Sequence, residues 1–197
     1  MTLDVPNEIP SQQIGGLAAA RIRYMDDALA SAIALGAKQH VILGAPAASP
    51  NSPLRVFHTG HPDIDQQSLC SALEESGFQF EQISFFSWLG ASRYLTAQDT
   101  IARLAFIGSL PTGSSVVFDY AVERTPVDPS DQMAMDALAS RCGKPGELLR
   151  LFINPTALDR LLRAAGFHHI EDLGPREIET RYRSQLNGIT HFVNARV

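Results

Sequence analysis

The sequence predicts an α/β fold in which a mostly parallel sheet is covered by helices on both faces. From residue 18 onward, short runs rich in apolar, β-branched and aromatic residues alternate with amphipathic segments of helical length. Several of these runs are apolar throughout, as strands buried on both faces are. Ligands of such sheets bind beyond the carboxyl ends of the strands. We therefore expect a site in the loops after Leu43, Phe57, Ser87 and Tyr120.

The first half of the chain contains two helix candidates and three strand candidates. Residues 18–35 have a helix-forming composition, an apolar face at intervals of three and four residues, and a glycine at the end. Residues 40–43 form a short apolar run that enters a proline-rich stretch, as a buried strand entering a loop does. Residues 54–57 and 83–89 are further strand candidates, and an amphipathic helix is expected within residues 65–77.

The second half continues the alternation of strands and helices. A helix is expected from an N-cap at Thr96 to Ile107, because Asp99 follows the threonine by three residues. Residues 115–120 are a β-branched run typical of a buried strand. A helix is expected to start at about Ser130, and Asn154 before a proline predicts the N-cap of another.

Two strand candidates, residues 168–173 and 189–196, close the chain. Within the first, His168 and His169 are adjacent, so strand alternation predicts that one ring points inward and the other outward. We interpret both as structural histidines.

Composition bounds the class of protein. The 197 residues are 45% hydrophobic and 19% charged, which predicts one domain over residues 1–197, with an N-terminal helical segment (1–36) and a sheet core (37–197). A net charge of −5 leaves no basic surplus for a nucleic acid partner. We expect no membrane partner, because no apolar run reaches bilayer length, and two reduced cysteines in a cytoplasmic protein.

Several motifs are similar, in order and spacing, to those of one family. They are Arg21-Ile22-Arg23-Tyr24-Met25-Asp26-Asp27, Leu43-Gly44-Ala45, Phe85-Phe86-Ser87-Trp88-Leu89-Gly90, Val117-Phe118-Asp119-Tyr120, Ala165-Gly166-Phe167 and Asp172-Leu173-Gly174-Pro175. From Arg21 to Val197 the chain resembles the leucine carboxyl methyltransferase and polyketide O-methyltransferase family. The resemblance implies a class I methyltransferase fold with a Rossmann-like sheet whose last strand is antiparallel. It also implies S-adenosylmethionine as cofactor, and methyl transfer to a carboxylate or hydroxyl oxygen of a small molecule.

The resemblance further implies which residues hold the methionine half of the cofactor. Gly44 and Ala45 would lie beside it, because a glycine at a strand end lets the backbone approach a ligand. Arg21 or Arg23 would offer a guanidinium to its carboxylate, in a bidentate pairing that lysine reproduces poorly. For Arg23, a solvated position on the helix face is the alternative.

Three other residues would contact the rest of the cofactor. Trp88 and Leu89 would wall it near the methyl group, with simple core packing as the alternative. His58 stands at the end of the second strand, where the family carries an acidic residue that accepts hydrogen bonds from both ribose hydroxyls. A neutral histidine accepts only one such bond.

Two further features depart from the family pattern. The first loop usually reads Gly-Ala-Gly-x-Asp-Thr, whereas this chain has a proline without an N–H group, Pro46, at the second glycine. Between Pro62 and Ile83 there is room for one helix only, so one edge strand of the family sheet is expected to be missing. The second strand then becomes an exposed edge.

Two functions follow from these observations. The first is an S-adenosylmethionine-dependent O-methyltransferase; a carboxylate substrate needs no general base, and for a hydroxyl substrate His58, His61 or Asp119 are the candidates, so the catalytic residues stay unknown. The second is a catalytically inactive methyltransferase-like scaffold that binds a metabolite, or a protein partner or second copy through the exposed sheet edge. Asp119 and Tyr120 either orient a substrate or are structural. We expect no metal site, since His58 and His61 fit a solvated loop.

Overall fold

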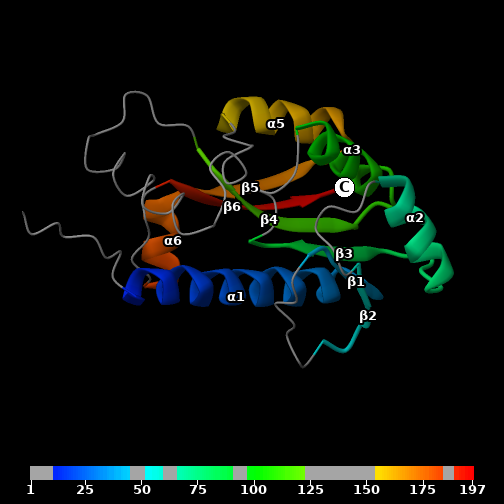
Figure 1. Cartoon of the computed structure of the whole chain (residues 1–197), viewed down its shortest axis with the longest axis horizontal. Coiled ribbons are helices and arrows are strands. Elements are labelled where there is room, and N and C mark those ends of the chain that lie inside the picture. Colours follow the sequence, from blue (N-terminus) through cyan, green and yellow to red (C-terminus); the bar gives the residue numbers. More distant parts are fainter. Residues whose placement is uncertain (1–10, 45–51, 60–65, 91–96, 123–153, 184–188) are drawn as a thin grey trace, which may run out of the picture.

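The computed structural model describes residues 11–44, 52–59, 66–90, 97–122, 154–183 and 189–197. They form a six-stranded sheet between two layers of helices (Figure 1). The strands are β1 (Gln39–Ile42), β2 (Arg55–His58), β3 (Ser84–Trp88), β4 (Ser115–Ala121), β5 (His169–Leu173) and β6 (Thr190–Arg196). The helices are α1 (Ser11–Ala34), α2 (Gln66–Glu75), α3 (Ala97–Gly108), α5 (Pro155–Ala164) and α6 (Pro175–Tyr182).

The strand order is β2-β1-β3-β4-β6-β5, and it confirms the predicted sheet. Strands β1 to β4 pair in parallel, whereas β6 runs antiparallel to both β4 and β5. In the described part of the chain β2 pairs with β1 alone, as expected of a sheet that lacks one edge strand of the family. The central strands β1 and β3 are buried along their whole length, because helices cover both faces.

Each face of the sheet has its own hydrophobic core. On one face α1 and α6 pack over a core that includes Tyr24, Phe85 and Phe192. On the other face α2, α3 and α5 bury side chains of the alternate strand positions, such as Phe86 and Phe118. Figure 1 shows α1 on one side of the sheet and α3 with α5 on the other. The alternation of side chains along each strand therefore determines which of the two faces each strand residue points to.

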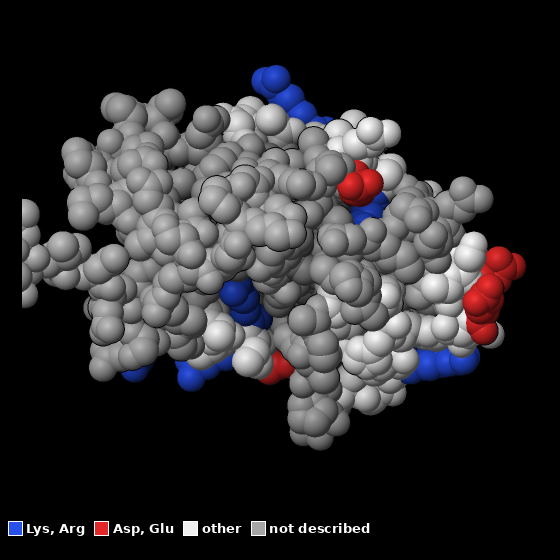
Figure 2. Space-filling model, in the orientation of Figure 1, with Lys and Arg blue, Asp and Glu red and all other residues white. Residues whose placement is uncertain are grey.

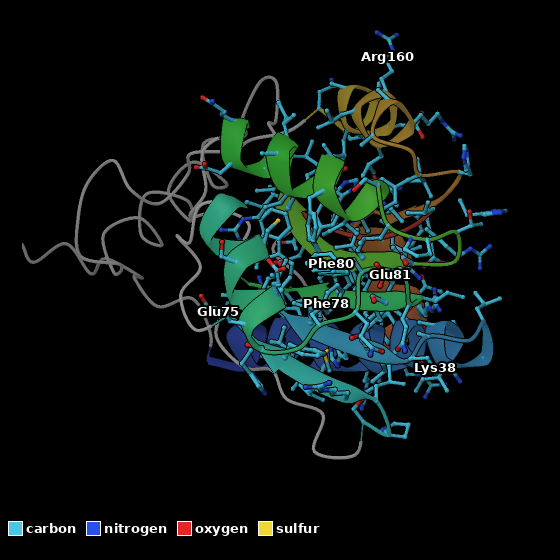
Figure 3. All side chains as sticks on the ribbon, turned by 90° about the vertical axis from the view of Figure 1, so that its right-hand side faces the viewer. Lys38, Glu75, Phe78, Phe80, Glu81 and Arg160 are labelled. Atoms are coloured by element: carbon cyan, nitrogen blue, oxygen red, sulfur yellow. The ribbon has the colours of Figure 1, made fainter. Side chains whose placement is uncertain are left out.

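Helix α2 is held against the sheet by aromatic side chains. Phe78 lies 5.4 Å from Phe57 and 5.1 Å from Phe80, as distances between ring centroids. Figure 3 shows Phe78 and Phe80 between α2 and the sheet, and Arg160 pointing away from the outer side of α5. The contact with Phe57 fixes the edge strand β2 to the rest of the core.

The two C-terminal helices start at different kinds of cap. At α5 the side chain of Asn154 accepts hydrogen bonds from the N–H groups of Thr156 and Ala157, which confirms the predicted N-cap. Helix α6, between β5 and β6, is absent from the sequence prediction. Its signal is Pro175 at the first turn and Glu177, whose carboxylate accepts a hydrogen bond from the Gly174 N–H at 2.6 Å.

Two expectations from the sequence are not confirmed: the helix near Ser130 and the inward orientation of one of two adjacent histidines. The helix expected from about Ser130 lies outside the described residues. The expectation that one of His168 and His169 points inward is wrong, because both are exposed. Strand β5 begins only at His169 and lies at the edge of the sheet, where its first residues extend beyond the core.

The surface of the described residues mixes charges of both signs. In the view of Figure 2, Lys and Arg side chains and Asp and Glu side chains are visible in a few small, separate groups. Across the described ranges, no helix combines the length and the apolar character needed to cross a bilayer.

Candidate functional site

The carboxyl ends of β1, β3 and β4 meet at one edge of the sheet, where the sequence predicts a ligand site. Gly44 follows β1 with φ 99°, and Gly90 follows β3 with φ 75°. Both angles lie in the left-handed region that favours glycine, so both turns depend on the missing side chain. Ala45, the second predicted residue of the first loop, lies outside the described residues.

Arg21 reaches this edge from α1 and pairs with Asp119 of β4. Its Nε and Nη2 atoms donate to the same oxygen, Oδ2, at 3.0 and 2.5 Å. The second carboxylate oxygen, Oδ1, accepts the backbone N–H of Gly90 at 2.5 Å. The side chains of Arg21 and Asp119 are only 18% and 6% exposed, so these charge-assisted bonds are partly shielded from water. Asp119 thereby ties α1 to the ends of β3 and β4.

The ion pair leaves one end of the Arg21 guanidinium unused. Nη1 makes no hydrogen bond with any residue that the structure describes, and it lies 3.9 Å from the point where a side chain on Gly90 would begin. An arginine has five N–H donors, of which the two bonds to Asp119 use two. The guanidinium is therefore held in place through Nε and Nη2, and Nη1 is not used within the described residues.

Arg23, the other predicted clamp residue, points elsewhere. Two residues along an α-helix correspond to a rotation of about 200°, so Arg21 and Arg23 cannot face the same way. Arg23 is exposed, and its Nη1 donates to the carbonyl of Tyr182 at the end of α6, at 3.2 Å. The structure thus brings Arg21, and not Arg23, to the carboxyl edge of the sheet.

The remaining predicted cofactor residues lie in three different parts of the fold. Trp88 is fully buried in the core below α3, with its ring centroid 6.0 Å from that of Phe118. Leu89 is half-buried and packs on the opposite face, against the core below α1. His58 is exposed at the end of β2, in register with Ile42 of β1. His58 is therefore the one of the three that is open to solvent at a strand end.

A cluster that the sequence prediction missed lies on the other face of β4. The Tyr120 hydroxyl donates to Oδ2 of Asp172 at 2.6 Å, and His191 Nδ1 lies 2.9 Å from Oδ1 of the same carboxylate. The Tyr120 hydroxyl also lies 3.3 Å from His191 Nδ1. Burial, followed by the bond to Asp172, raises the pKa of Tyr120, which keeps the phenol protonated.

The cluster determines which nitrogen of His191 is basic. A carboxylate only accepts hydrogen bonds, so Nδ1 carries the hydrogen that is shared with Asp172. Nε2 then holds the lone pair of the neutral ring, and it makes no hydrogen bond within the described ranges. A histidine oriented in this way by a carboxylate can act as a general base. The sequence pattern does not predict this cluster, because His191 meets Tyr120 only through the antiparallel pairing of β6 with β4.

A buried histidine, His40, supports the sheet near β2. His40 is 1% exposed, and its Nε2 lies 2.8 Å from the Ser87 hydroxyl. Burial, with a smaller contribution from the neighbouring His58, lowers the pKa of His40 to about 4. The ring is therefore neutral at physiological pH, and its role is to pack between β1 and β3.

The fold and the site together define a methyltransferase-like α/β protein: a parallel sheet with an antiparallel last strand, glycine turns after β1 and β3, and an anchored arginine beside them. Solved structures agree. A SAM-dependent methyltransferase from Archaeoglobus fulgidus aligns with a TM-score of 0.58 over 95% of both chains, at 11% identity. A protein from Thermobifida fusca described as a "putative methyltransferase" aligns with a TM-score of 0.59 over 95% of this chain and 83% of its own, at 12% identity. At such identities the likeness shows the fold.

Sequence comparison finds similarity to methyltransferases as well. The model of the leucine carboxyl methyltransferase family matches residues 3–46. The Bacillus subtilis (strain 168) protein YktD, named "Putative S-adenosyl-L-methionine-dependent methyltransferase", is 26% identical over an alignment of 199 residues, gaps included. The alignment covers 84% of this chain. The chain is thus similar to the leucine carboxyl methyltransferase family over residues 3–46, and to YktD over most of its length. It spans 65% of the length of YktD.

Proposed function

We propose that this chain is an S-adenosylmethionine-dependent O-methyltransferase that acts on a small molecule. The observation that carries the proposal is the guanidinium of Arg21, which Asp119 anchors at the carboxyl edge of the sheet with Nη1 left to bind a ligand. A carboxylate matches this donor in charge and in geometry. The relatives of the chain, described as dependent on S-adenosylmethionine, support the choice of ligand.

The residues present fit the cofactor at its methionine end. Arg21 would hold the carboxylate, the backbone at Gly44 and Ala45 would lie beside the amino acid portion, and His58 would accept one hydrogen bond from the ribose. The positive φ of Gly44 supports this assignment, because such a turn favours glycine, which places no side chain between the backbone and a ligand. When bound, the cofactor supplies an electrophilic methyl group on its sulfonium, and the protein's part is to align the accepting oxygen.

His191 supports a hydroxyl group as the acceptor. A carboxylate is already a nucleophile, whereas a hydroxyl must lose its proton as the new bond to carbon forms. His191 Nε2 would take that proton, and Asp172 would stabilise the resulting imidazolium through Nδ1. Tyr120 holds Asp172 in place, because its hydroxyl donates to the other carboxylate oxygen. In this arrangement His191 is the catalytic base, and Asp172 and Tyr120 are positioning residues.

The second candidate function is a scaffold that binds another chain without transferring methyl groups. The observation in its favour is the outer edge of β2, which no described strand covers. Val56 is 37% exposed on this strand, and unpaired backbone groups at a sheet edge can accept a strand from a partner or from a second copy.

Calorimetric titration with S-adenosylmethionine and S-adenosylhomocysteine separates the two candidates, since no substrate is needed. We expect saturable binding that Arg21→Ala weakens at least about tenfold, the order expected for the loss of one charge-assisted hydrogen bond. Arg23→Ala is the matched control, because its side chain bonds a distant carbonyl, and it should bind normally. The reverse pattern would assign the clamp to Arg23. Absence of heat with a folded wild-type protein would favour the scaffold.

A further inference from the structure

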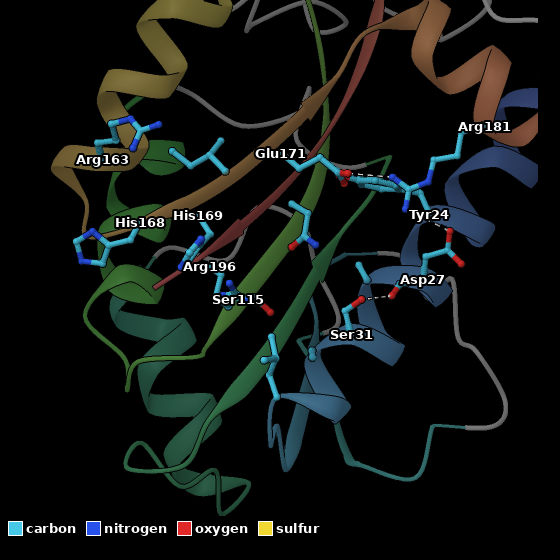
Figure 4. Close-up of a pocket in the computed structure, with 15 residues that line it drawn as sticks. Tyr24, Asp27, Ser31, Ser115, Arg163, His168, His169, Glu171, Arg181 and Arg196 are labelled. Carbon is cyan, nitrogen blue, oxygen red and sulfur yellow. Dashed lines mark hydrogen bonds and ion pairs between the residues drawn. The ribbon is translucent and has the colours of Figure 1, made fainter.

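A pocket of about 510 Å³ lies on the face of the sheet that α1 covers (Figure 4). Its floor is formed by the first residues of β4 and β5 and the last residues of β6, and its wall by the C-terminal half of α1. These strand ends form the edge of the sheet opposite to the carboxyl ends of β1, β3 and β4. The pocket is therefore separate from the site assigned to the cofactor.

Three polar residues form one row across the pocket floor. Arg196 of β6 is in register with Ser115 of β4 on one side and with His169 of β5 on the other. Residues in register on adjacent strands point to the same face and lie about 5 Å apart. Figure 4 shows all three side by side on the strands. Asn194, two residues before Arg196, faces the same pocket.

The charge of Arg196 is not neutralised within the described part of the protein. Its side chain forms no hydrogen bond and no ion pair there, although it is half-buried. The two acidic residues of the lining are already engaged. Glu171 binds Arg181 at 2.9 Å and the Tyr24 hydroxyl at 3.2 Å, and Asp27 accepts the Tyr182 hydroxyl at 2.9 Å.

The other charged lining residue near the row is also paired. Arg163 holds Asp159 at 2.9 Å in an exposed ion pair on α5. His168 and His169 are exposed and make no side-chain hydrogen bond with the residues described. The uncompensated group at the row is thus the guanidinium of Arg196, with the hydroxyl of Ser115 and the amide of Asn194 as neutral donors beside it.

The opposite wall of the pocket combines apolar and polar side chains of α1. Ala28, Ala32 and Leu35, which is 47% exposed, form its apolar part, and Asp27 and Ser31 lie beside them. A ligand that fills this space would place an anionic group on Arg196 and an apolar body against α1.

We propose that this pocket binds small organic acids, with the guanidinium of Arg196 pairing two oxygens of a carboxylate or phosphate group. Ser115 and Asn194 complete the site as hydrogen-bond donors. The ligand is an oxyanion with an apolar body of about one ring. Its binding in this pocket does not depend on methyl transfer.

The test titrates the full chain with benzoate, phenyl phosphate and the neutral benzyl alcohol, by calorimetry. We expect saturable binding of at least one acid below about 10 mM and no binding of the alcohol. Arg196→Gln should lower the affinity at least tenfold, and Ser115→Ala should lower it by a smaller factor. Arg160→Gln is the matched control, because Arg160 points away from the pocket on the outer side of α5 and should bind normally (Figure 3).

The outcomes are distinct. Binding of phenyl phosphate alone would assign a phosphorylated ligand, and binding of benzoate alone a carboxylic acid. Equal affinities for the wild-type protein and Arg196→Gln, or no saturation by either acid with a folded protein, would overturn the proposal. The Arg21→Ala variant should keep the acid site, and Arg196→Gln should keep any S-adenosylmethionine binding, so failure of one site is separable from failure of the other.

Discussion

Arg21 and Asp119, 98 positions apart in the sequence, meet through two hydrogen bonds to a single carboxylate oxygen. The other oxygen holds the backbone N–H of Gly90. The aspartate therefore fixes the arginine, the turn after β3 and the end of β4 relative to one another. If Arg21 binds a ligand carboxylate, its orientation depends on Asp119.

Asp119→Asn should destabilise the fold by about 3 kcal/mol, because it leaves the partly buried Arg21 without its counter-charge. Urea unfolding measures the change. Arg21→Ala should cost a similar amount, and the double variant less than the sum, because both single changes break the same pair. Asp159→Asn is the control: it removes an exposed ion pair with Arg163 and should change stability by less than about 0.5 kcal/mol. Additive effects of Arg21 and Asp119 would contradict a coupled pair.

His191→Asn should separate binding from catalysis. Asparagine can still donate to Asp172 from the position of Nδ1, but it has no basic nitrogen to replace Nε2. Transfer to a hydroxyl acceptor should slow at least about 100-fold, with S-adenosylmethionine affinity unchanged. The rate with a carboxylate acceptor, which needs no base, should not change. An unchanged rate with a hydroxyl acceptor would exclude His191 as the base.

His40 should make the stability of the protein depend on pH. Its pKa is about 4 in the folded protein against 6.5 ordinarily, so the unfolded chain binds the proton more readily between these values. Its contribution to stability is full above pH 6.5 and falls by about 3 kcal/mol as pH decreases to 4. Urea unfolding at several pH values measures this slope. His40→Gln keeps a group that can bond Ser87 and removes the titration, so its slope should be flatter; an identical slope would contradict the assignment.

Gly108→Ala should be among the most destabilising single substitutions in α3. A Cβ atom at Gly108 would lie 1.9 Å from the carbonyl oxygen of Ala165, so helix α3 and the end of α5 would have to separate. We expect a loss of about 3 kcal/mol in thermal or urea unfolding, at the upper end of the usual cost of overpacking. Gly174→Ala is the control, because its Cβ would crowd the end of the flexible Glu177 side chain, at 2.9 Å, and would meet the His191 ring only at ordinary contact distances of 3.5 and 3.6 Å. A cost at Gly108 below about 1 kcal/mol would show that the two helices adapt.

The sequence alone determined the elements whose signals are local. The strand at residues 115–121 and the cap of α5 at Asn154 depend on β-branched side chains and on one amide side chain, and both are where the sequence predicts them. The antiparallel last strand and the missing edge strand followed from the resemblance to a family whose motif spacing survives the shortening between Pro62 and Ile83. Helix α6 was missed because its eight residues carry mainly a capping signal and little apolar periodicity.

Only the tertiary structure decided which side chains meet. The sequence offered Arg21 and Arg23 equally, and the rotation of α1 over the sheet selected Arg21 for the edge near Asp119. His191 joined Tyr120 and Asp172, and Arg196 joined Ser115 and His169, because β6 inserts between β4 and β5. The physical reason is that local patterns set the conformation of a segment, whereas strand register and helix rotation depend on the burial of the whole core.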